Sequence, residues 1–388
     1  EIAAATEETS SGAGGNVTVT ASDLVELSGT RPDGTPGGLY TFTLSSGDGG
    51  KLTINTRQFM ARDGASVASS TGSTGNAGDL EINASESMQV INAEIRARTT
   101  LDVVDAGDAG NLLINTNQLI VREGGLVSAS TFASGEAGTL TVNADDFVQV
   151  IGTSADGETS SRLFLDSTGS GNAGELEINT GTLMVEEGGR VSATTSDQGQ
   201  AGNLIVNADF VQVIGTSANG ELSSSLLFDT SGSGDAGTLD INTNRLVVRD
   251  GARVSADTSS TGEAGKLNVT ATESVEVIGT SADGQTASSL LFDSSAAETG
   301  GNAGELTIDT SRLIVQDGGL VSATTANTGE AGKLTVNASE SVEVIGTAPD
   351  GTTPSRLRFD SLASETGGNA GELTIDTSRL IVKDGGLV

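Results

Sequence analysis

Apolar and polar residues alternate along short segments of the chain, with Leu and Ile or Val two positions apart. Examples are KLTIN (51–55) and ELTID (305–309). This period of two places both apolar side chains on one face of a strand. A second alternating segment follows each of these, such as QLIV (118–121), and then a third, such as LVSA (126–129). The pattern predicts three short strands in each repeat and no helix.

A glycine motif, Gly-x-Ala/Gly-Gly, marks the start of every repeat. Every second repeat is 28 residues long, whereas the repeats between them have 32 to 39 residues. The segment GNAGELTIDTSRLIV occupies 301–315 and returns letter for letter at 368–382. The motif ends at Gly15, Gly50, Gly78, Gly110, Gly138, Gly174, Gly202, Gly237, Gly265, Gly304, Gly332 and Gly371.

The strands of one repeat carry too few apolar residues to build a core, so the repeats must stack on one another. We therefore expect an all-β fold, a single right-handed parallel β-helix of about twelve rungs of three short strands. Short and long rungs alternate along one continuous β-solenoid, 1–388. Its pair repeats run roughly over 15–77, 78–137, 138–201, 202–264, 265–331 and 332–388. Because the chain opens and stops within a repeat, we expect a segment of a longer protein.

A polar residue, most often asparagine, closes the first strand of each repeat. In a stacked coil these side chains form a column in which the amides bond to one another. A row of ligand-binding amides is the alternative. The asparagines of this structural column are Asn55, Asn83, Asn115, Asn143, Asn179, Asn207, Asn242 and Asn337.

The third strand predicts a core position that alternates in size. Long repeats have phenylalanine there and short repeats have alanine, which fills a narrow core without voids. The phenylalanines are Phe228, Phe292 and Phe359, and the alanines are Ala129, Ala193, Ala256 and Ala323.

Carboxylates recur at one corner of the short repeats, directly before a glycine. Four of them follow a basic residue, and all are interpreted as a solvated face. They are Asp63, Glu123, Glu187, Asp250, Asp317 and Asp384.

Five long repeats carry an additional loop at this corner, as in GTSADG (152–157), whereas the repeat that starts at Gly78 lacks it. Asp-Gly and Asn-Gly form turns readily. Loops on a rigid scaffold favour a ligand-contact ridge, but spacers that only close a longer coil have the same sequence. The candidate contact residues are Asp33, Asp156, Asn219, Asp283 and Asp350.

Composition excludes several classes of function. The 388 residues have no Cys and no His, and the formal net charge is −33. Such a charge repels nucleic acids and anionic lipids. Without Cys the chain has no thiolate metal ligand, and without His it lacks the commonest general base. We expect no cofactor, no metal site and no catalytic residues.

Paired carboxylates are the remaining option for catalysis, because glycosidases use two of them. The pairs are Asp102/Asp105, Asp145/Asp146 and Glu186/Glu187. Adjacent residues on a strand point to opposite faces, and no break in the repeat opens a cleft beside them. A polysaccharide-active β-helix enzyme is therefore only a distant alternative.

The phrases GNAGELTIDTSRLIVQDGGLVSA (301–323) and GEAGKLTVNASESVEVIGT (329–347) resemble repeats of cyanobacterial large exoproteins of the filamentous-haemagglutinin type. The resemblance implies a β-helical stalk that is secreted by the two-partner route or attached to the cell surface. It also implies an adhesive or structural role without enzymatic activity. A self-assembling fibre, surface layer or sheath is the alternative.

The expected partners follow from the same resemblance and from the acidic charge. They are a second copy of the chain end to end or further repeats of the same chain, with surface glycans or divalent cations as further candidates. Neither nucleic acid nor membrane insertion is expected.

Overall fold

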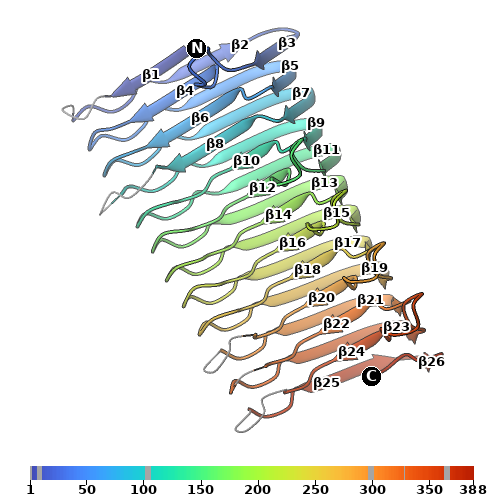
Figure 1. The fold of residues 1–388 in the computed structure, drawn as a ribbon. Coiled ribbons are helices and arrows are strands. Elements are labelled where there is room, and N and C mark those ends of the chain that lie inside the picture. Colours follow the sequence, from blue (N-terminus) through green and yellow to red (C-terminus); the bar gives the residue numbers. More distant parts are fainter. Residues whose placement is uncertain (1, 7–10, 101–105, 296–300, 327, 362–367) are drawn as a thin grey trace. The chain divides into compact units, whose positions relative to one another are not determined.

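The computed structural model describes residues 2–6, 11–100, 106–295, 301–326, 328–361 and 368–388. These residues form strands joined by turns and contain no helix. Every strand pairing between named strands is parallel, which confirms the predicted parallel β-solenoid (Figure 1). Since the described part of the chain has no helix, it also has none that could cross a membrane.

The chain divides into two compact units. Unit 1 comprises Glu1–Gly181 with Arg190–Gly202, and unit 2 comprises Thr182–Gly189 with Asn203–Val388. Strand β13 (Glu175–Glu186) contributes residues to both units.

Two parallel sheets build unit 1. The first has the order β1-β4-β6-β8-β10-β12-β14 and the second contains β2 and β3 side by side against β5, followed by β7, β9 and β11. The strands of the first sheet are β1 (Ile2–Thr6), β4 (Gly38–Thr43), β6 (Ser66–Thr71), β8 (Glu94–Thr99), β10 (Leu126–Ser128), β12 (Arg162–Phe164) and β14 (Arg190–Ser192). Those of the second are β2 (Val17–Thr20), β3 (Leu24–Ser28), β5 (Leu52–Arg62), β7 (Leu80–Ile91), β9 (Leu112–Arg122) and β11 (Leu140–Ile151).

Unit 2 repeats this arrangement. Its short strands follow the order β16-β18-β20-β22-β24, and its long strands follow β15-β17-β19-β21-β23-β25, with β26 beside β23. The short strands are β16 (Ser225–Leu227), β18 (Arg253–Ser255), β20 (Ser289–Leu291), β22 (Leu320–Ser322) and β24 (Arg356–Arg358). The long strands are β15 (Asn203–Ile214), β17 (Thr238–Arg249), β19 (Lys266–Ile278), β21 (Glu305–Gln316), β23 (Lys333–Ile345), β25 (Glu372–Thr377) and β26 (Leu380–Lys383).

The first two strands predicted in a repeat run together as one long strand, except in the first repeat, where β2 and β3 are separate, and in the last, where β25 and β26 are separate. A register shift marks the joint, for example between Ala144 and Phe147 of β11 where it pairs with β9. One strand has two residues at this bend and its neighbour has one, which is the geometry of a β-bulge. A bulge turns the chain while the hydrogen-bonded ladder continues on both sides, so this corner needs no glycine.

The predicted core positions lie inside the coil. Leu306 and Ile308 of β21 are 1% and 0% exposed, and they stand in register with Leu334 and Val336 of β23. The alternation of large and small residues is confirmed by Phe228, Ala256, Phe292 and Ala323, which are all fully buried, whereas Phe359 is only half-buried. Ala129 and Ala193 are fully buried in unit 1.

Candidate functional site

The additional loops of the long repeats share one backbone conformation. In each loop an isolated antiparallel bridge joins the two ends, as between Thr280 and Ala287. Inside this bridge, the Ser281 N–H donates to the Thr286 carbonyl at 2.7 Å and the Gly284 N–H donates to the Ser281 carbonyl at 2.8 Å. The same hydrogen bonds recur at equivalent positions in the loops that begin at Gly152, Gly215 and Gly346. The Gly29 loop is one residue shorter and has the counterparts Arg31 N–H to Thr35 carbonyl and Gly34 N–H to Arg31 carbonyl. The sequence therefore folds each loop into a small closed turn.

The five candidate contact residues lie exposed at the tips of these turns. Each side-chain oxygen also accepts a hydrogen bond from the backbone N–H two residues later, the pattern of an Asx turn. The donors are the N–H groups of Thr35, Glu158, Glu221, Gln285 and Thr352, at 2.9 to 3.2 Å. The tip residues thus have a structural role in addition to any contact they make.

The same hydrogen bonds affect the charge of the tips. The side-chain hydrogen bond from Ser281 holds the pKa of Asp283 below its usual value, and that from Thr352 does the same for Asp350. In unit 1 the Thr35 N–H lowers the pKa of Asp33, and the Ser154 hydroxyl lowers that of Asp156. These four tips are therefore anionic at neutral pH.

The carboxylates of the short repeats occupy a strained position beside these loops. Asp63, Glu123, Glu187, Asp250, Asp317 and Asp384 all have φ between 53 and 59°. This left-handed region is rare for residues other than glycine, although Asp tolerates it. Each is followed by a glycine that also has positive φ, as in a type I′ turn.

Most of these carboxylates are exposed to solvent, in agreement with the interpretation as a solvated face. Asp317 is half-buried and the others are exposed. The four predicted basic neighbours form ion pairs, namely Arg62–Asp63, Arg122–Glu123, Arg249–Asp250 and Lys383–Asp384. The sequence pattern did not reveal that these residues also shape the turn.

The bases of the loops that begin at Gly152, Gly215, Gly279 and Gly346 pack against the turn glycine of the preceding short repeat. A Cβ atom on Gly251 would lie 2.7 Å from the Ser281 Cβ, and one on Gly318 would lie 2.9 Å from the Ala348 Cβ. Only glycine therefore permits the loop to approach the turn so closely.

A buried serine, which the repeat pattern did not predict, fastens this contact. The Ser288 hydroxyl accepts from the Gly251 N–H at 3.0 Å and donates to the Ile278 carbonyl at 2.7 Å. Ser161, Ser224 and Ser355 accept from the equivalent glycines Gly124, Gly188 and Gly318 at 2.9 to 3.0 Å. All four serines are fully buried. The available signal was a serine that always stands two residues before the leucine of the third strand.

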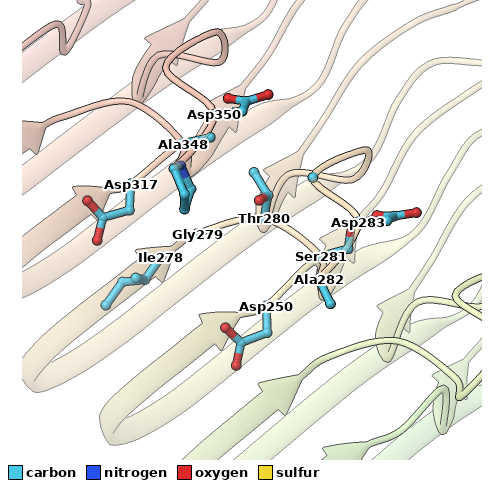
Figure 2. Close-up of a pocket in the computed structure, with 12 residues that line it drawn as sticks. Asp250, Ile278, Gly279, Thr280, Ser281, Ala282, Asp283, Asp317, Ala348 and Asp350 are labelled. Atoms are coloured by element: carbon cyan, nitrogen blue, oxygen red, sulfur yellow. The ribbon is translucent and has the colours of Figure 1, made fainter.

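Two neighbouring loops of unit 2 enclose an open groove of about 480 Å³ (Figure 2). Residues 278–284 and 348–350 line it together with Asp250 and Asp317. Figure 2 shows Asp250 and Asp317 on one side, Asp283 and Asp350 at the loop tips, and Thr280 between them. The groove therefore presents carboxylates on both sides. It can attract cationic or hydrogen-bond-donating groups, and no side chain in it forms a nucleophile–base pair.

The asparagine column forms a ladder of side-chain hydrogen bonds on the outer face of the long strands. In unit 1 the Nδ2 atoms of Asn83, Asn115, Asn143 and Asn179 each donate to the Oδ1 atom of the asparagine one rung earlier, at 2.8 to 3.0 Å. In unit 2, Asn242 donates to Asn207 at 3.0 Å and Asn337 donates to Asp309 at 2.7 Å.

The amides of this column are only partly covered. Those from Asn55 to Asn207 are half-buried, and Asn242 and Asn337 are exposed. The reason is strand alternation, because the neighbouring Leu and Ile or Val side chains occupy the inward positions.

The carboxylate pairs form no catalytic arrangement. Asp145 and Asp146 are both exposed, not on opposite faces as expected, because they form the bulge of β11. Glu186 is half-buried and Glu187 is exposed in the left-handed turn. Asp102 and Asp105 lie outside the described residues.

No group of three or more acidic side chains in the described ranges is arranged to hold a metal ion. Comparison with protein-family models, with curated proteins and with solved structures finds no match for this chain.

Proposed function

We propose that this chain is part of a non-enzymatic, extracellular stalk or adhesive rod of a haemagglutinin-like exoprotein, with a cyanobacterial source. The repeated loop is the observation that carries the proposal. Closed turns of one type project polar tips, four of them acidic and one an asparagine, and a buried serine holds the base of the four loops that begin at Gly152, Gly215, Gly279 and Gly346. Loops held on a parallel coil suit repeated weak contacts, whose combined strength exceeds that of any single contact.

Surface glycans and other polar surfaces are the proposed contacts, and divalent cations are the proposed mediators. The formal charge of −33 repels anionic surfaces unless cations intervene. Carboxylates on both sides of the unit 2 groove provide oxygen ligands of the kind that Ca²⁺ accepts.

Adsorption of the purified chain to glycan-coated and cell surfaces tests this proposal, with Ca²⁺ or with a chelator. The informative variant combines Asp283→Asn with Asp350→Asn. Asn219 shows that an amide maintains the same turn, since its Oδ1 accepts from the Glu221 N–H at 3.2 Å. The variant therefore removes charge from the groove and leaves the loop fold intact. A variant with Asp235→Asn and Glu263→Gln, two exposed carboxylates elsewhere on unit 2, is the matched control for net charge.

We expect Ca²⁺-dependent adsorption by the parent and the control, and reduced adsorption by the loop variant. Equal adsorption of all three proteins would contradict a role of the loops. Filaments in electron micrographs without any adsorption would favour the self-assembling fibre. Antibody labelling of intact cells from the source organism tests the proposed location, and labelling only after permeabilisation would refute it.

A further inference from the structure

Three carboxylates occupy equivalent positions on successive rungs of unit 2. Asp229, Asp257 and Asp293 each lie two residues after β16, β18 and β20, which pair in register. The backbone N–H of Asp257 donates to the Asp229 Oδ1 atom at 2.9 Å, and that of Asp293 donates to the Asp257 Oδ1 atom at 2.8 Å. The rung spacing separates neighbouring carboxylates by about 5 Å.

Among the described residues, one guanidinium contacts this carboxylate column. Arg253 of β18 forms an ion pair with Asp257 and lies 3.4 Å from the Asp229 Oδ2 atom. The charged groups that face Asp257 are thus Arg253 from its own rung, Asp229 from the β16 rung and Asp293 from the β20 rung. Two negative charges therefore remain uncompensated when all three carboxylates ionise.

Asp257 has the least favourable surroundings for a charge. Its side chain is 16% exposed and that of Asp229 is 28% exposed. Hydroxyl groups donate to both outer carboxylates: Ser255 to Asp229 at 2.6 Å and Ser322 to Asp293 at 2.7 Å. The partners described for the Asp257 carboxylate are the Asp293 N–H and Arg253.

We propose that Asp257 holds a proton in the folded chain near neutral pH, so that the carboxylate column is a latch of unit 2 that strengthens in acid. Burial raises the pKa of Asp257 to about 7, assisted by Asp229 and Asp293 and opposed by Arg253. A protonated carboxyl group carries no charge and gains an O–H donor. A neutral Asp257 then no longer repels the carboxylates of Asp229 and Asp293.

The direction of the pH effect follows from proton linkage. The ordinary pKa of 3.8 applies to Asp257 in the unfolded chain, and about 7 applies in the folded chain. Between these values the folded chain binds more protons, so its stability falls as the pH rises. The contribution is fully present below about pH 4 and is lost as the pH passes about 7. Within this window the equilibrium constant for unfolding of unit 2 rises by up to about tenfold per pH unit.

Substitution Asp257→Asn tests the latch, because an amide is neutral at every pH and still accepts the Asp293 N–H. The matched control is Asp235→Asn. Asp235 is exposed, and its Oδ1 atom accepts a hydrogen bond from the Glu263 N–H at 2.9 Å. Glu263 lies 28 positions after Asp235, just as Asp257 lies 28 positions after Asp229, so both hydrogen bonds join neighbouring rungs. The control thus makes the same chemical change at the same type of hydrogen bond, outside the column.

The assay is urea denaturation in steps from about pH 5 to about pH 8, where the linkage acts. We expect the parent and Asp235→Asn to lose stability together as the pH rises. The Asp257→Asn variant should lose less and become the most stable of the three at the upper end. Parallel pH profiles for all three proteins would overturn the proposal.

A direct titration keeps the proposal testable if Asp257→Asn fails to fold. Infrared difference spectra of the folded parent report the C=O stretch of protonated carboxyl groups. We expect one such group to lose its proton near pH 7, well above the ordinary range of Asp. Titration of every carboxyl group below about pH 5 would refute the latch.

Discussion

Replacing Ser288 by alanine removes the fastening of one loop without changing the exposed surface. The hydroxyl is fully buried and makes two hydrogen bonds, to the Gly251 N–H and the Ile278 carbonyl. Alanine leaves the buried Gly251 N–H without this partner, whereas the Ile278 carbonyl still accepts from the Asp250 N–H at 3.3 Å. An orphaned buried donor costs about 1–3 kcal/mol, and we expect the variant to lose a similar amount of unfolding free energy.

Far-ultraviolet circular dichroism during urea denaturation measures this loss, since the chain has no Trp and its one tyrosine, Tyr40, lies in unit 1. Repeat proteins can open locally. Hydrogen exchange of the peptides that contain Gly251 and Thr280 should therefore show the loss of protection directly. Ser259→Ala, at an exposed serine of the same unit, is the control and should change stability by less than about 0.5 kcal/mol. Equal stability and equal exchange in both variants would refute the fastening role of Ser288.

Three further substitutions probe the core, the ladder and the turn by thermal or urea denaturation. Leu306→Asp places an unpaired charge at a position that is 1% exposed, and should cost about 3–5 kcal/mol or prevent folding; a melt like that of the parent would exclude the inward assignment. Asn143→Ala removes one donor and one acceptor from the ladder, but the site is half-buried, so we expect a loss of only about 0.5–1.5 kcal/mol. A loss above about 3 kcal/mol would mean a buried column. Gly318→Ala forces a Cβ to within 2.9 Å of Ala348 at φ of 95°, and should cost about 1–3 kcal/mol. Gly351→Ala, with φ of 73° and no atom near the new Cβ, should cost less, and equal losses would exclude the close contact.

The period of two and the glycine spacing were sufficient to predict the coil. Leu and Ile or Val at alternate positions admit only one inward face, and a column such as Asn55 to Asn179 appears once the repeats are aligned. Phe292 between Ala256 and Ala323 was predictable for the same reason, because stacked positions must fill one core.

Features that depend on the bend of a strand or on contacts between rungs could not be predicted from the sequence. The joint at Ala144 and Phe147 has no glycine or proline, so the pattern gave two strands where a bulge gives one bent strand. The left-handed φ of Asp317 and the burial of Ser355 arise from a loop that packs on a turn one rung away, a contact that local periodicity does not encode. Likewise, alternation shows that the asparagines avoid the core, but not how much of each amide its neighbours cover.

The distance between two loop tips tests most directly whether the loops project at regular intervals from a parallel coil. The chain has no cysteine, so Ala218→Cys and Pro349→Cys can each carry a single spin label. Both residues are exposed, in the loops that follow β15 and β23 of unit 2. These strands are separated by β17, β19 and β21, which places the tips four rung steps apart. Pulsed electron paramagnetic resonance should therefore give a narrow distance distribution centred at about 19 Å. A broad distribution, or a mean distance of several tens of ångströms, would contradict the display of these loops on a parallel coil.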